Sequence, residues 1–483
     1  MFSSGKIKIP GTLRKMNSIF ASHGFKAYLV GGAVRDMIMG KPCHDWDVAT
    51  DATPADVMRI FHKVIPTGIA HGTVTVRILG SQIETTTFRT EAAYSDGRHP
   101  DSVSYASTIE EDLSRRDFTM NAMAAELGSG KLVDPFGGQR DIADKIIRTV
   151  GSPYERFSED GLRPVRAVRF ASQLGFSIEA ETLKALSDPA ILKKVSGISV
   201  ERFRDEFCKL LMSQKPSVGL RLLESSGILG IFIPEFTPCR NCSQRDDRGF
   251  HEFDVADHIF YSCDSPCVPY PLSDSDSAEK GTSLTVRLSA FYHDIGKPAA
   301  RTEETVASDG GNVTRVHFHG HEAEGERICR ESMSRLKFSN DEIKRVSHLV
   351  REHMFNYESV WSDAAVRRFI IRIGEGNLGD IIALRVADIH GMHNVPLDYR
   401  SPAWKLLTEL MERVERLRAQ KMAGSLKDLA VDGKDLIATG IPPGKSMGLI
   451  LNELFAAVTD SPEMNEKERL IPLALSIYRT RFS

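Results

Sequence analysis

The chain has 483 residues, of which 41% are hydrophobic and 26% charged, and its formal net charge at pH 7 is −3. This length predicts two to four domains, and the small net charge excludes a uniformly basic surface, although a local basic patch would suffice to bind nucleic acid. No apolar run approaches the roughly 20 residues of a membrane span, and the first ten residues lack the apolar core of a secretory signal. Seven cysteines do not suggest a disulfide framework, so we expect a cytoplasmic protein.

The first part of the chain combines short β-rich runs with helical patterns. A helix is predicted at Pro54–Phe61, where Thr53 is a suitable cap and Pro54 stands at the first helical position. The predicted strands, rich in Val, Ile, Thr and aromatic residues, are Lys26–Val30, Trp46–Ala49, Thr73–Ile78 and Gln82–Phe88. We therefore predict a small domain of mixed α and β structure over residues 20–150.

From about Glu155 the pattern changes, because apolar residues now recur at helical spacing. The helices predicted here are Leu162–Leu174, Ala180–Leu186, Val200–Leu211 and Val218–Ser225. A loop-rich segment follows from Pro234 to Ser283, after which helical patterns continue to the end of the chain. We expect almost no strands in this part, and all-α regions over residues 151–238, 250–400 and 401–483.

Two glycines at a predicted strand–helix turn, Gly31 and Gly32, are followed by Asp45 and Asp47 on the next predicted strand. The glycines let the backbone approach a ligand closely, and the helix start offers free N–H groups to an anion. Residues two apart on a strand share a face, so the carboxylates repel each other unless a cation such as Mg²⁺ lies between them. Such a cation suits the activation of a hydroxyl and the release of pyrophosphate. The alternative is an exposed loop with two solvated aspartates.

Further motifs follow in a fixed order. The ordered motifs are Gly31-Gly32-x-Val34-Arg35-Asp36, Asp45-x-Asp47, Arg115-Arg116-Asp117-Phe118-Thr119-Met120-Asn121-Ala122, Asp134-Pro135-Phe136-Gly137-Gly138 and Glu159-Asp160-x-x-Arg163-x-x-Arg166-x-x-Arg169-Phe170. This series resembles the nucleotidyltransferase signature of DNA polymerase beta-type enzymes, and in detail the class II CCA-adding enzymes and poly(A) polymerases. The resemblance implies an α+β nucleotidyltransferase head followed by all-α neck, HD and tail regions. It covers the first half of the chain densely and the remainder more weakly.

The resemblance also implies roles for individual residues of the head. Asp45 and Asp47 would be the catalytic ligands of Mg²⁺, while Gly32, Arg35 and Arg116 would contact the incoming nucleotide. Asp117 and Asn121 are expected to organise the site rather than bind the nucleotide. Glu84, on a predicted strand, is the candidate third carboxylate, and its alternative is an edge-strand glutamate facing water.

A pair of opposite charges, Asp160 and Arg163, is predicted on one face of a helix. Cytosine and adenine each present an amine beside a ring-nitrogen acceptor, whereas uracil and guanine present a carbonyl beside a ring N–H. Because ionised Asp only accepts and Arg only donates hydrogen bonds, this pair fits C and A and mismatches U and G. The resemblance implies the same role, with Arg166 and Arg169 holding the triphosphate. The alternative is a solvated arginine face paired with Glu159 and its neighbours.

CCA addition and poly(A) addition share these motifs. The segment Phe88–Pro100 resembles the flexible loop of full CCA-adding enzymes, and Ile69–Val74 is similar to the CCA-type sequence. We therefore favour addition of CCA to tRNA from CTP and ATP, with poly(A) or A-only addition as the alternative. No membrane and no obligatory protein partner are expected. Two further alternatives stay open: a phosphohydrolase whose head only binds nucleotide or RNA, and a non-enzymatic RNA-binding protein.

A second candidate centre begins at His293-Asp294, at the end of the apolar stretch Leu284–Tyr292. Adjacent imidazole and carboxylate groups suit a divalent transition metal or Mg²⁺. His258, His321, His353 and Asp388 complete a pattern that resembles HD-superfamily phosphohydrolases. The resemblance implies metal ligands at His258, His293, Asp294 and Asp388, and a possible second metal at His321 and His353.

The same resemblance implies hydrolysis of phosphomonoesters or cyclic phosphates, such as those on damaged tRNA ends. Lys297 is a candidate to stabilise the substrate phosphate. The alternative is an HD scaffold kept for its helical shape. Four cysteines, Cys239, Cys242, Cys263 and Cys267, have roughly zinc-ligand spacing, but ordinary reduced cysteines are the preferred interpretation.

Overall fold

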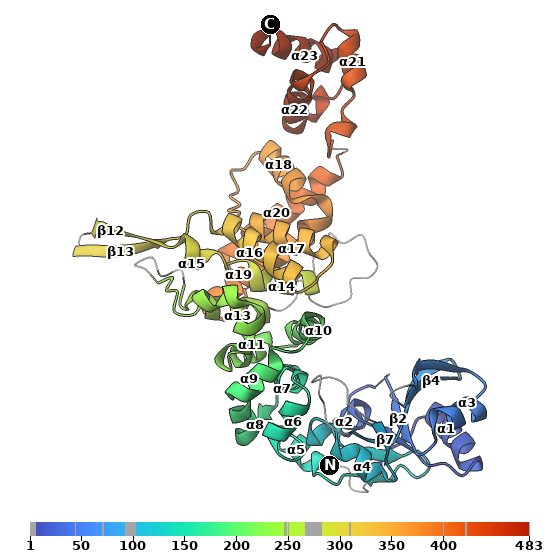
Figure 1. The fold of residues 1–483 in the computed structure, drawn as a ribbon. Coiled ribbons are helices and arrows are strands. Elements are labelled where there is room, and N and C mark those ends of the chain that lie inside the picture. Colours follow the sequence, from blue (N-terminus) through green and yellow to red (C-terminus); the bar gives the residue numbers. More distant parts are fainter. Residues whose placement is uncertain are drawn as a thin grey trace. The chain divides into compact units, whose positions relative to one another are not determined.

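The computed structural model describes residues 6–43, 45–69, 72–91, 103–245, 249, 251–265, 283–308, 311–398, 400–420 and 423–482. It divides into two compact units, Met1–Pro234 and Glu235–Ser483, which are taken here one at a time (Figure 1). Among the helices within these ranges, none is both long and apolar enough to cross a membrane. The four smaller domain ranges predicted above remain a prediction.

A seven-stranded mixed sheet forms the centre of the head. Its order is β3-β4-β5-β2-β1-β8-β9, and its strands are β1 (Ala27–Val30), β2 (Asp47–Thr50), β3 (Val64–Gly68), β4 (Thr73–Ile78), β5 (Ser81–Thr87), β8 (Ala124–Glu126) and β9 (Leu132–Val133). Strand β1 is antiparallel to both β2 and β8, whereas β2 and β5 run parallel. The four predicted strands are all present, with ends shifted by at most one residue.

Short helices surround this sheet, namely α1 (Gly11–Ser22), α2 (Gly32–Ile38), α3 (Pro54–Ile60), α4 (Ile109–Ser114) and α5 (Gly138–Ala143). The predicted cap of α3 is confirmed, because the Thr53 side chain accepts a hydrogen bond from the backbone N–H of Asp56. A small hairpin of β6 (Arg89–Glu91) and β7 (Val103–Tyr105) lies beside α4. Apolar residues from β1, β2, α4 and β8 share one buried cluster, which fixes the strands that carry the first candidate site.

The neck of the first unit is almost entirely helical. Its helices are α6 (Pro153–Glu159), α7 (Leu162–Leu174), α8 (Ala180–Ala185), α9 (Pro189–Val195), α10 (Val200–Leu211), α11 (Pro216–Ser225) and α12 (Ile228–Phe232). Helix α7 packs against α10 and α11, so it is buried along most of its length. A short strand, β11 (Ser177–Ile178), pairs in parallel with β10 (Ile146–Ile147) and ties the neck to the head.

The second unit begins with a helical bundle. Its helices are α13 (Val255–Asp264), α14 (Leu284–Tyr292), α15 (Lys297–Ala300), α16 (His321–Arg335), α17 (Asn340–Glu352) and α19 (Leu378–His393). Helix α13 packs on α14 and α19, and α14 packs on α17. These contacts bring together residues that lie more than 100 positions apart in the sequence.

The expectation of an all-helical second half was wrong at one place. Strands β12 (Thr302–Ser308) and β13 (Gly311–His317) form an antiparallel hairpin that projects from the helices of its own unit (Figure 1). The sequence held a partial signal, because β-favouring Thr and Val residues occur on both sides of the turn-type pair Asp309-Gly310.

The last part of the chain is helical, as predicted. It contains α18 (Asp363–Ile373), α20 (Pro402–Arg418), α21 (Gly433–Ala438), α22 (Lys445–Asp460) and α23 (Lys467–Arg481). Buried apolar side chains of α21, α22 and α23 form a small core of their own.

Candidate functional site

The carboxylates of the head gather on two parallel strands. Asp47 opens β2 and stands in register with Glu84 on the neighbouring strand β5. Asp45 was predicted inside a strand, but β2 begins only at Asp47, so Asp45 lies just before it. The pKa of Asp47 is raised to about 6, first by burial and then by the negative charges of Glu84 and Asp45. Three mutually repelling carboxylates, on and just before the paired strands β2 and β5, are a donor set that a hard divalent cation would stabilise.

This raised pKa predicts a stability effect in the metal-free protein. The folded state holds the Asp47 proton up to about pH 6, whereas the ordinary value is 3.8, so the ionised carboxylate destabilises the fold above pH 6. Asp47→Asn should therefore raise the free energy of unfolding at pH 8 by about 1–2 kcal/mol after solvent screening. The gain should shrink as the pH falls from 6 towards 4.

Thermal unfolding in the presence of a chelator measures this difference. The matched control is Asp144→Asn, because the Asp144 side chain at the end of α5 is 52% exposed and should change stability little at either pH. An Asp47→Asn protein that is no more stable than the wild type at pH 8 would contradict the carboxylate cluster.

Gly31 joins β1 to α2 in a conformation that favours glycine. Its φ is +70°, and a Cβ atom there would lie 3.0 Å from Nη1 of Arg116 and 3.8 Å from Oδ2 of Asp47. The turn therefore has both the backbone geometry and the close approach that only glycine permits. It also places Arg116 beside the carboxylate cluster, since the positive charge of Arg116 acts to lower the pKa of Asp47.

Arg35 and Arg116, two predicted nucleotide contacts, are held by partners within the head. Nη1 of Arg35 donates to Oδ1 of Asn121 at 2.8 Å, and its Nε donates to Oδ1 of Asp36 at 2.9 Å. Arg116 is ion-paired with Asp112 at 3.3 Å. Because these guanidinium groups are anchored, they present fixed rather than mobile positive charge to the site.

The predicted face shared by Asp160 and Arg163 was wrong in its geometry. Helix α6 ends at Glu159 and α7 begins at Leu162, so Asp160 is extended between two helices, with φ −140° and ψ 112°. Its carboxylate accepts the backbone N–H of Leu162 at 2.9 Å and pairs with Arg202 of α10 at 2.8 Å. The helix is broken at Asp160 itself, since Gly161 already has helical dihedrals at the start of α7.

Arg163 has a different set of partners from Asp160. Its guanidinium forms an ion pair with Glu159, and donates to the carbonyl oxygens of Arg156 at 3.0 Å and Arg115 at 3.1 Å. Within the part of the chain that the structure describes, no side-chain hydrogen bond or ion pair joins Asp160 to Arg163, although the backbone N–H of Arg163 donates to the carbonyl oxygen of Asp160 at 3.0 Å. Each is instead positioned separately at the junction of α6 and α7, and Arg163 is also tied to the head through Arg115.

Arg166 and Arg169 continue along α7, and each has a buried acidic partner. Nε and Nη2 of Arg166 donate to Oδ2 of Asp117 at 2.8 and 2.7 Å. Burial opposes ionisation of Asp117, but the charge and hydrogen bonds of Arg166 outweigh it and hold its pKa below the usual value. Arg169 pairs with Glu206 of α10 and lies 3.9 Å from the centre of the Phe170 ring. These arginines therefore join the head, α7 and α10 in one charged network.

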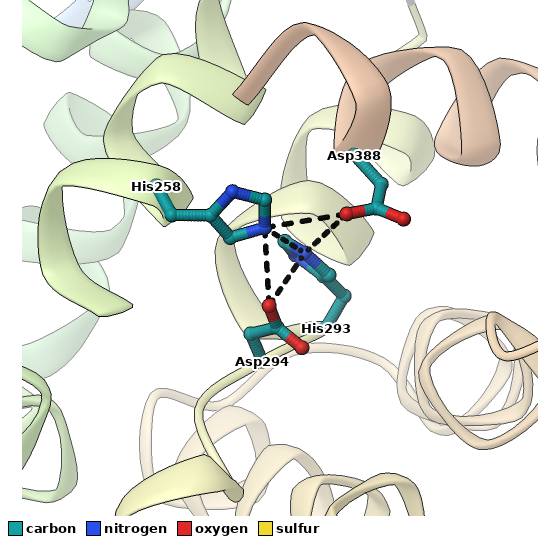
Figure 2. A group of neighbouring side chains, drawn as sticks. All are labelled: His258, His293, Asp294 and Asp388. Atoms are coloured by element: carbon teal, nitrogen blue, oxygen red, sulfur yellow. Dashed lines mark hydrogen bonds and ion pairs between the residues drawn. The ribbon is translucent and has the colours of Figure 1, made fainter. Parts of the chain in front are cut away.

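Four ligand atoms converge in the second unit, as Figure 2 shows. Nε2 of His258 (α13) lies 3.0 Å from Nε2 of His293, 3.0 Å from Oδ2 of Asp294 and 3.3 Å from Oδ1 of Asp388 (α19). All four ligand atoms lie within 4.8 Å of one another, and all four residues are buried. The predicted first ligand set is thus brought together by helices that are distant in sequence.

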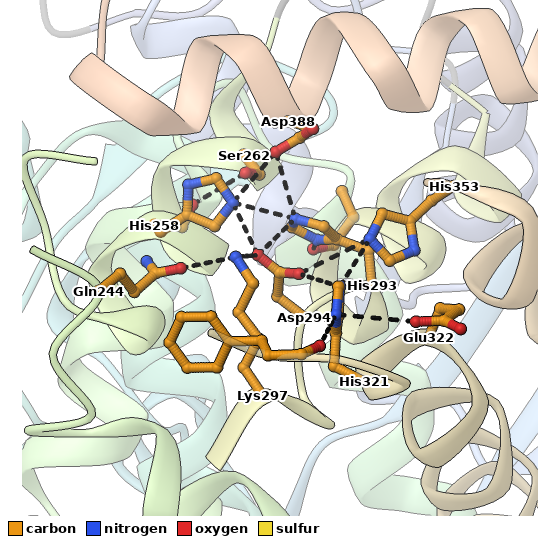
Figure 3. Close-up of polar contacts among 12 residues, drawn as sticks. Gln244, His258, Ser262, His293, Asp294, Lys297, His321, Glu322, His353 and Asp388 are labelled. Carbon is orange, nitrogen blue, oxygen red and sulfur yellow. Dashed lines mark hydrogen bonds and ion pairs between the residues drawn. The ribbon is translucent and has the colours of Figure 1, made fainter. Parts of the chain in front are cut away.

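A second set shares one of these residues. Oδ1 of Asp294 lies 3.3 Å from Nε2 of His321 and 3.6 Å from Nε2 of His353, whereas its Oδ2 faces His258 and His293 (Figure 3). Asp294 is therefore placed to bridge two cations, with one carboxylate oxygen for each. This arrangement also assembles His321 and His353, the candidate ligands of a second metal.

Backbone carbonyls orient three of these histidines. Nδ1 of His293 lies 2.8 Å from the oxygen of Ala290, and Nδ1 of His321 and His353 each lie 2.7 Å from the carbonyl oxygen three residues earlier. A proton on Nδ1 makes Nε2 the nitrogen that would bind a metal in each ring, once any proton on Nε2 is displaced, which is the arrangement that metal-binding histidines use. The rings are thus fixed with Nε2 towards Asp294.

The charges in this centre are strongly coupled. Burial disfavours the charged form of His293, but Asp294 and Asp388 outweigh it and raise the pKa of His293 to about 10. Burial likewise opposes ionisation of Asp294, yet His293 and Lys297 hold its pKa well below the usual value. A buried set of two carboxylates and four imidazoles fits a divalent ion of the Mn, Fe, Co or Ni type.

The structure gives no support to a four-cysteine zinc site. Cys239 and Cys242 are buried in one turn, while Sγ of Cys263 lies 3.9 Å from the carbonyl oxygen of Arg287. No cysteine belongs to either ligand group found among the described residues. Cys267 lies outside the described residues, as do Ala70, His71 and the loop residues Ala92–Pro100 that were used to favour CCA addition.

Several functional partners were missed from the sequence. Arg202 and Glu206 on α10 hold Asp160 and Arg169, and Arg385 and Gln244 approach the metal centre. Arg202, Glu206 and Gln244 lie tens of residues from their partners, so no local motif marks them, whereas Arg385 lies only three residues from Asp388 on α19 and could have been found from that spacing.

Comparisons with known proteins agree with the ordered motifs. The model of the Poly A polymerase head domain matches residues 27–148, that of the RNA and SrmB-binding site of polymerase A matches residues 175–240, and that of tRNA nucleotidyltransferase domain 2 matches residues 322–474. The CCA-adding enzyme of Pediococcus pentosaceus is 35% identical over 449 residues, 93% of each chain. That of Lactiplantibacillus plantarum is 53% identical over 197 residues, 41% of this chain and 48% of the relative.

Solved structures are similar over nearly the whole chain. The Bacillus stearothermophilus CCA-adding enzyme in complex with CTP has a TM-score of 0.69 and 29% identity, covering 97% of this chain and 98% of that one. The Thermotoga maritima CCA-adding enzyme complexed with tRNA has a TM-score of 0.55 at 19% identity, covering 96% of this chain and 94% of the other, so this second likeness concerns the fold alone.

Proposed function

This chain belongs to the family of CCA-adding enzymes, and we propose that it adds C, C and A to the 3′ end of tRNA from CTP and ATP, in the cytoplasm. The observation that carries this proposal is the identity of 35% with one such enzyme along 93% of both chains. The carboxylate cluster at Asp45, Asp47 and Glu84, with Arg116 close to Asp47, supports this proposal.

In this reaction the 3′ hydroxyl of tRNA attacks the α-phosphate of the nucleotide, and pyrophosphate leaves. We assign Asp45 and Asp47 as the ligands of Mg²⁺, with Glu84 beside Asp47 as the third carboxylate. Mg²⁺ held there would activate the attacking hydroxyl and offset the charge of the leaving group. Gly31 and Gly32 allow the nucleotide to approach the backbone, while Arg35, Arg116, Arg166 and Arg169 supply fixed positive charge for the triphosphate.

Choice of the base falls to Asp160 and Arg163. The carboxylate accepts a hydrogen bond from the amine of C or A, and the guanidinium donates one to the ring nitrogen beside it. Because these side chains are positioned by different partners, Arg202 and Glu159, they form two separately supported points of contact. Uracil and guanine would leave both groups facing like polarity, at a cost of about 1–3 kcal/mol each.

A selectivity measurement tests this assignment. Asp160→Ala and Arg163→Ala should each lower discrimination against UTP and GTP by about 10- to 100-fold, the scale of one mismatched buried group. Arg202→Met should act in the same direction but less strongly, because Asp160 remains but is no longer held.

The readout is kcat/KM for CTP against UTP, and for ATP against GTP, on tRNA primers of defined length. Arg204→Met is the matched control, since Arg204 lies on the same helix and pairs with Asp205. A lower rate with selectivity unchanged would assign Asp160 and Arg163 a structural role only.

For the second unit we propose a metal-dependent phosphohydrolase that acts on phosphomonoesters or cyclic phosphates. Support comes from the two buried ligand sets that share Asp294. A divalent ion bound there would polarise a phosphate ester towards attack by water. His258, His293, Asp294 and Asp388 are the ligands of one ion, and Asp294, His321 and His353 those of the other.

Nucleotide incorporation tests the first proposal directly. Full-length protein, Mg²⁺, CTP and ATP are mixed with a tRNA that ends at the discriminator base, and the product is sequenced at its 3′ end. Incorporation of C, C and A is the expected result. Incorporation of ATP alone, or of a long A tract, would instead assign poly(A) or A-only addition.

A further inference from the structure

A buried lysine lies inside the second ligand cluster. Nζ of Lys297 is 2.6 Å from Oδ2 of Asp294 and donates to Oε1 of Gln244, also at 2.6 Å (Figure 3). Lys297 is 6% exposed and Gln244 is 4% exposed. A buried ammonium group is stable only when it is paired and hydrogen-bonded, so Asp294 is the counter-charge that holds Lys297 in this position.

A second basic group neutralises the other carboxylate of the cluster. Nη1 of Arg385 lies 2.6 Å from Oδ2 of Asp388 on the same helix, α19. Asp294 and Asp388 contribute two negative charges, and Lys297 and Arg385 contribute two positive charges. The imidazoles add no negative charge, and Glu322, whose Oε2 lies 3.8 Å from Nδ1 of His321, is itself paired with Arg351 at 4.0 Å. The cluster therefore has no negative charge left over to balance an added divalent cation.

Lys297 also contacts an oxygen atom of Asp294 that a bound cation would need as a ligand. The oxygen that it contacts, Oδ2 of Asp294, is the same one that faces Nε2 of His258 at 3.0 Å and Nε2 of His293 at 3.2 Å. A cation coordinated by these three residues would share this oxygen with the ammonium group. Two neighbouring positive charges on one carboxylate oxygen repel each other, and a negatively charged partner for Lys297 would relieve that repulsion.

We propose that Lys297 is a built-in counter-ion through which the cluster binds a divalent cation and a phosphate-type anion cooperatively. This inference rests on the proposed metal centre. It adds that a phosphate-type substrate controls how tightly the divalent cation binds there. In the metal-free state Lys297 neutralises Asp294. When cation and anion bind together, the ammonium group of Lys297 would leave Asp294 and pair with the anion. The Asp294 carboxylate would then be free to bind the cations.

Cobalt binding in the full-length chain tests the inference. Co²⁺ with imidazole ligands has visible absorption bands, and an Asp45→Ala, Asp47→Ala background removes the carboxylate site of the head. Inorganic phosphate should tighten Co²⁺ binding in this background by about 5- to 150-fold, the usual range of coupling between two sites, and Co²⁺ should tighten phosphate binding by the same factor.

Lys297→Met separates charge from packing, because methionine keeps much of the length of the side chain. In this variant Co²⁺ should bind more tightly without phosphate, and the effect of phosphate should largely disappear. Gln244→Leu, which removes the hydrogen-bond partner of Lys297 but no charge, should keep the coupling. Should Lys297→Met fail to fold, Lys297→Gln replaces it, and the phosphate dependence of the unsubstituted cluster is a test in itself.

The outcomes are distinguishable. Equal Co²⁺ affinity with and without phosphate, or weaker Co²⁺ binding in a folded Lys297→Met protein, overturns the counter-ion role while leaving the metal centre intact. Absence of any Co²⁺ band in the protein with an unsubstituted cluster removes the proposed metal centre, and the inference with it.

Discussion

Alanine at Asp45 or at Asp47 should lower the rate of nucleotide addition by roughly a thousandfold or more, the scale on which preorganised charge acts in catalysis. Asp47 lies near Arg116, and its raised pKa reflects burial first and then repulsion by Glu84 and Asp45. The loss should appear in kcat with CTP and with ATP alike, because the ligands act on the phosphates rather than on the base.

Two controls make this result specific. Asp144→Ala, an exposed position in the same head, should retain full activity, and any phosphatase activity of the second unit should be unchanged in all three variants. Addition that survives both Asp45→Ala and Asp47→Ala would show that the catalytic carboxylates lie elsewhere.

Substitution of Asp294 should remove phosphatase activity and spare nucleotide addition, the reverse of the effects expected for Asp45→Ala and Asp47→Ala. Asp294→Asn is expected to abolish phosphatase activity and to remove both metal sites, because each oxygen of Asp294 faces a different ligand set. His321→Ala should remove only the second site, since His258, His293 and Asp388 remain. CCA addition should continue in both variants.

Metal content of the purified variants, measured by elemental analysis, distinguishes these cases. His393→Ala is the matched control, because His393 lies on α19 with Asp388 but its side chain is 53% exposed. A full metal content in Asp294→Asn, or a complete loss in His321→Ala, would contradict the shared carboxylate.

The sequence was sufficient for the parts of the fold that local patterns determine. Helices α7 and α10 have the predicted bounds, and the strands that carry Asp47 and Glu84 were predicted within two residues. The hairpin β12–β13 was not predicted, although Thr and Val occur on both sides of Asp309-Gly310. There the turn signal was overlooked within a chain segment that was otherwise helical.

The candidate metal ligands could be predicted from the sequence, but the residue that holds Asp160 could not. The six residues of the second centre were chosen from the sequence, and the structure brings them together around Asp294. The role of Asp160 was inferred from a helix that in fact ends one residue earlier, at Glu159, because the backbone of Asp160 is extended. Its true partner, Arg202, lies 42 residues away, and only the packing of α10 against α7 reveals it.

The account depends most on the claim that protein side chains, rather than a template, select the base. A crystal structure of this chain with a primer tRNA and CTP tests the claim directly. It should place the amine of cytosine at hydrogen-bond distance from the Asp160 carboxylate and the ring nitrogen beside it at that distance from the Arg163 guanidinium. A cytosine ring bound away from both side chains would contradict it.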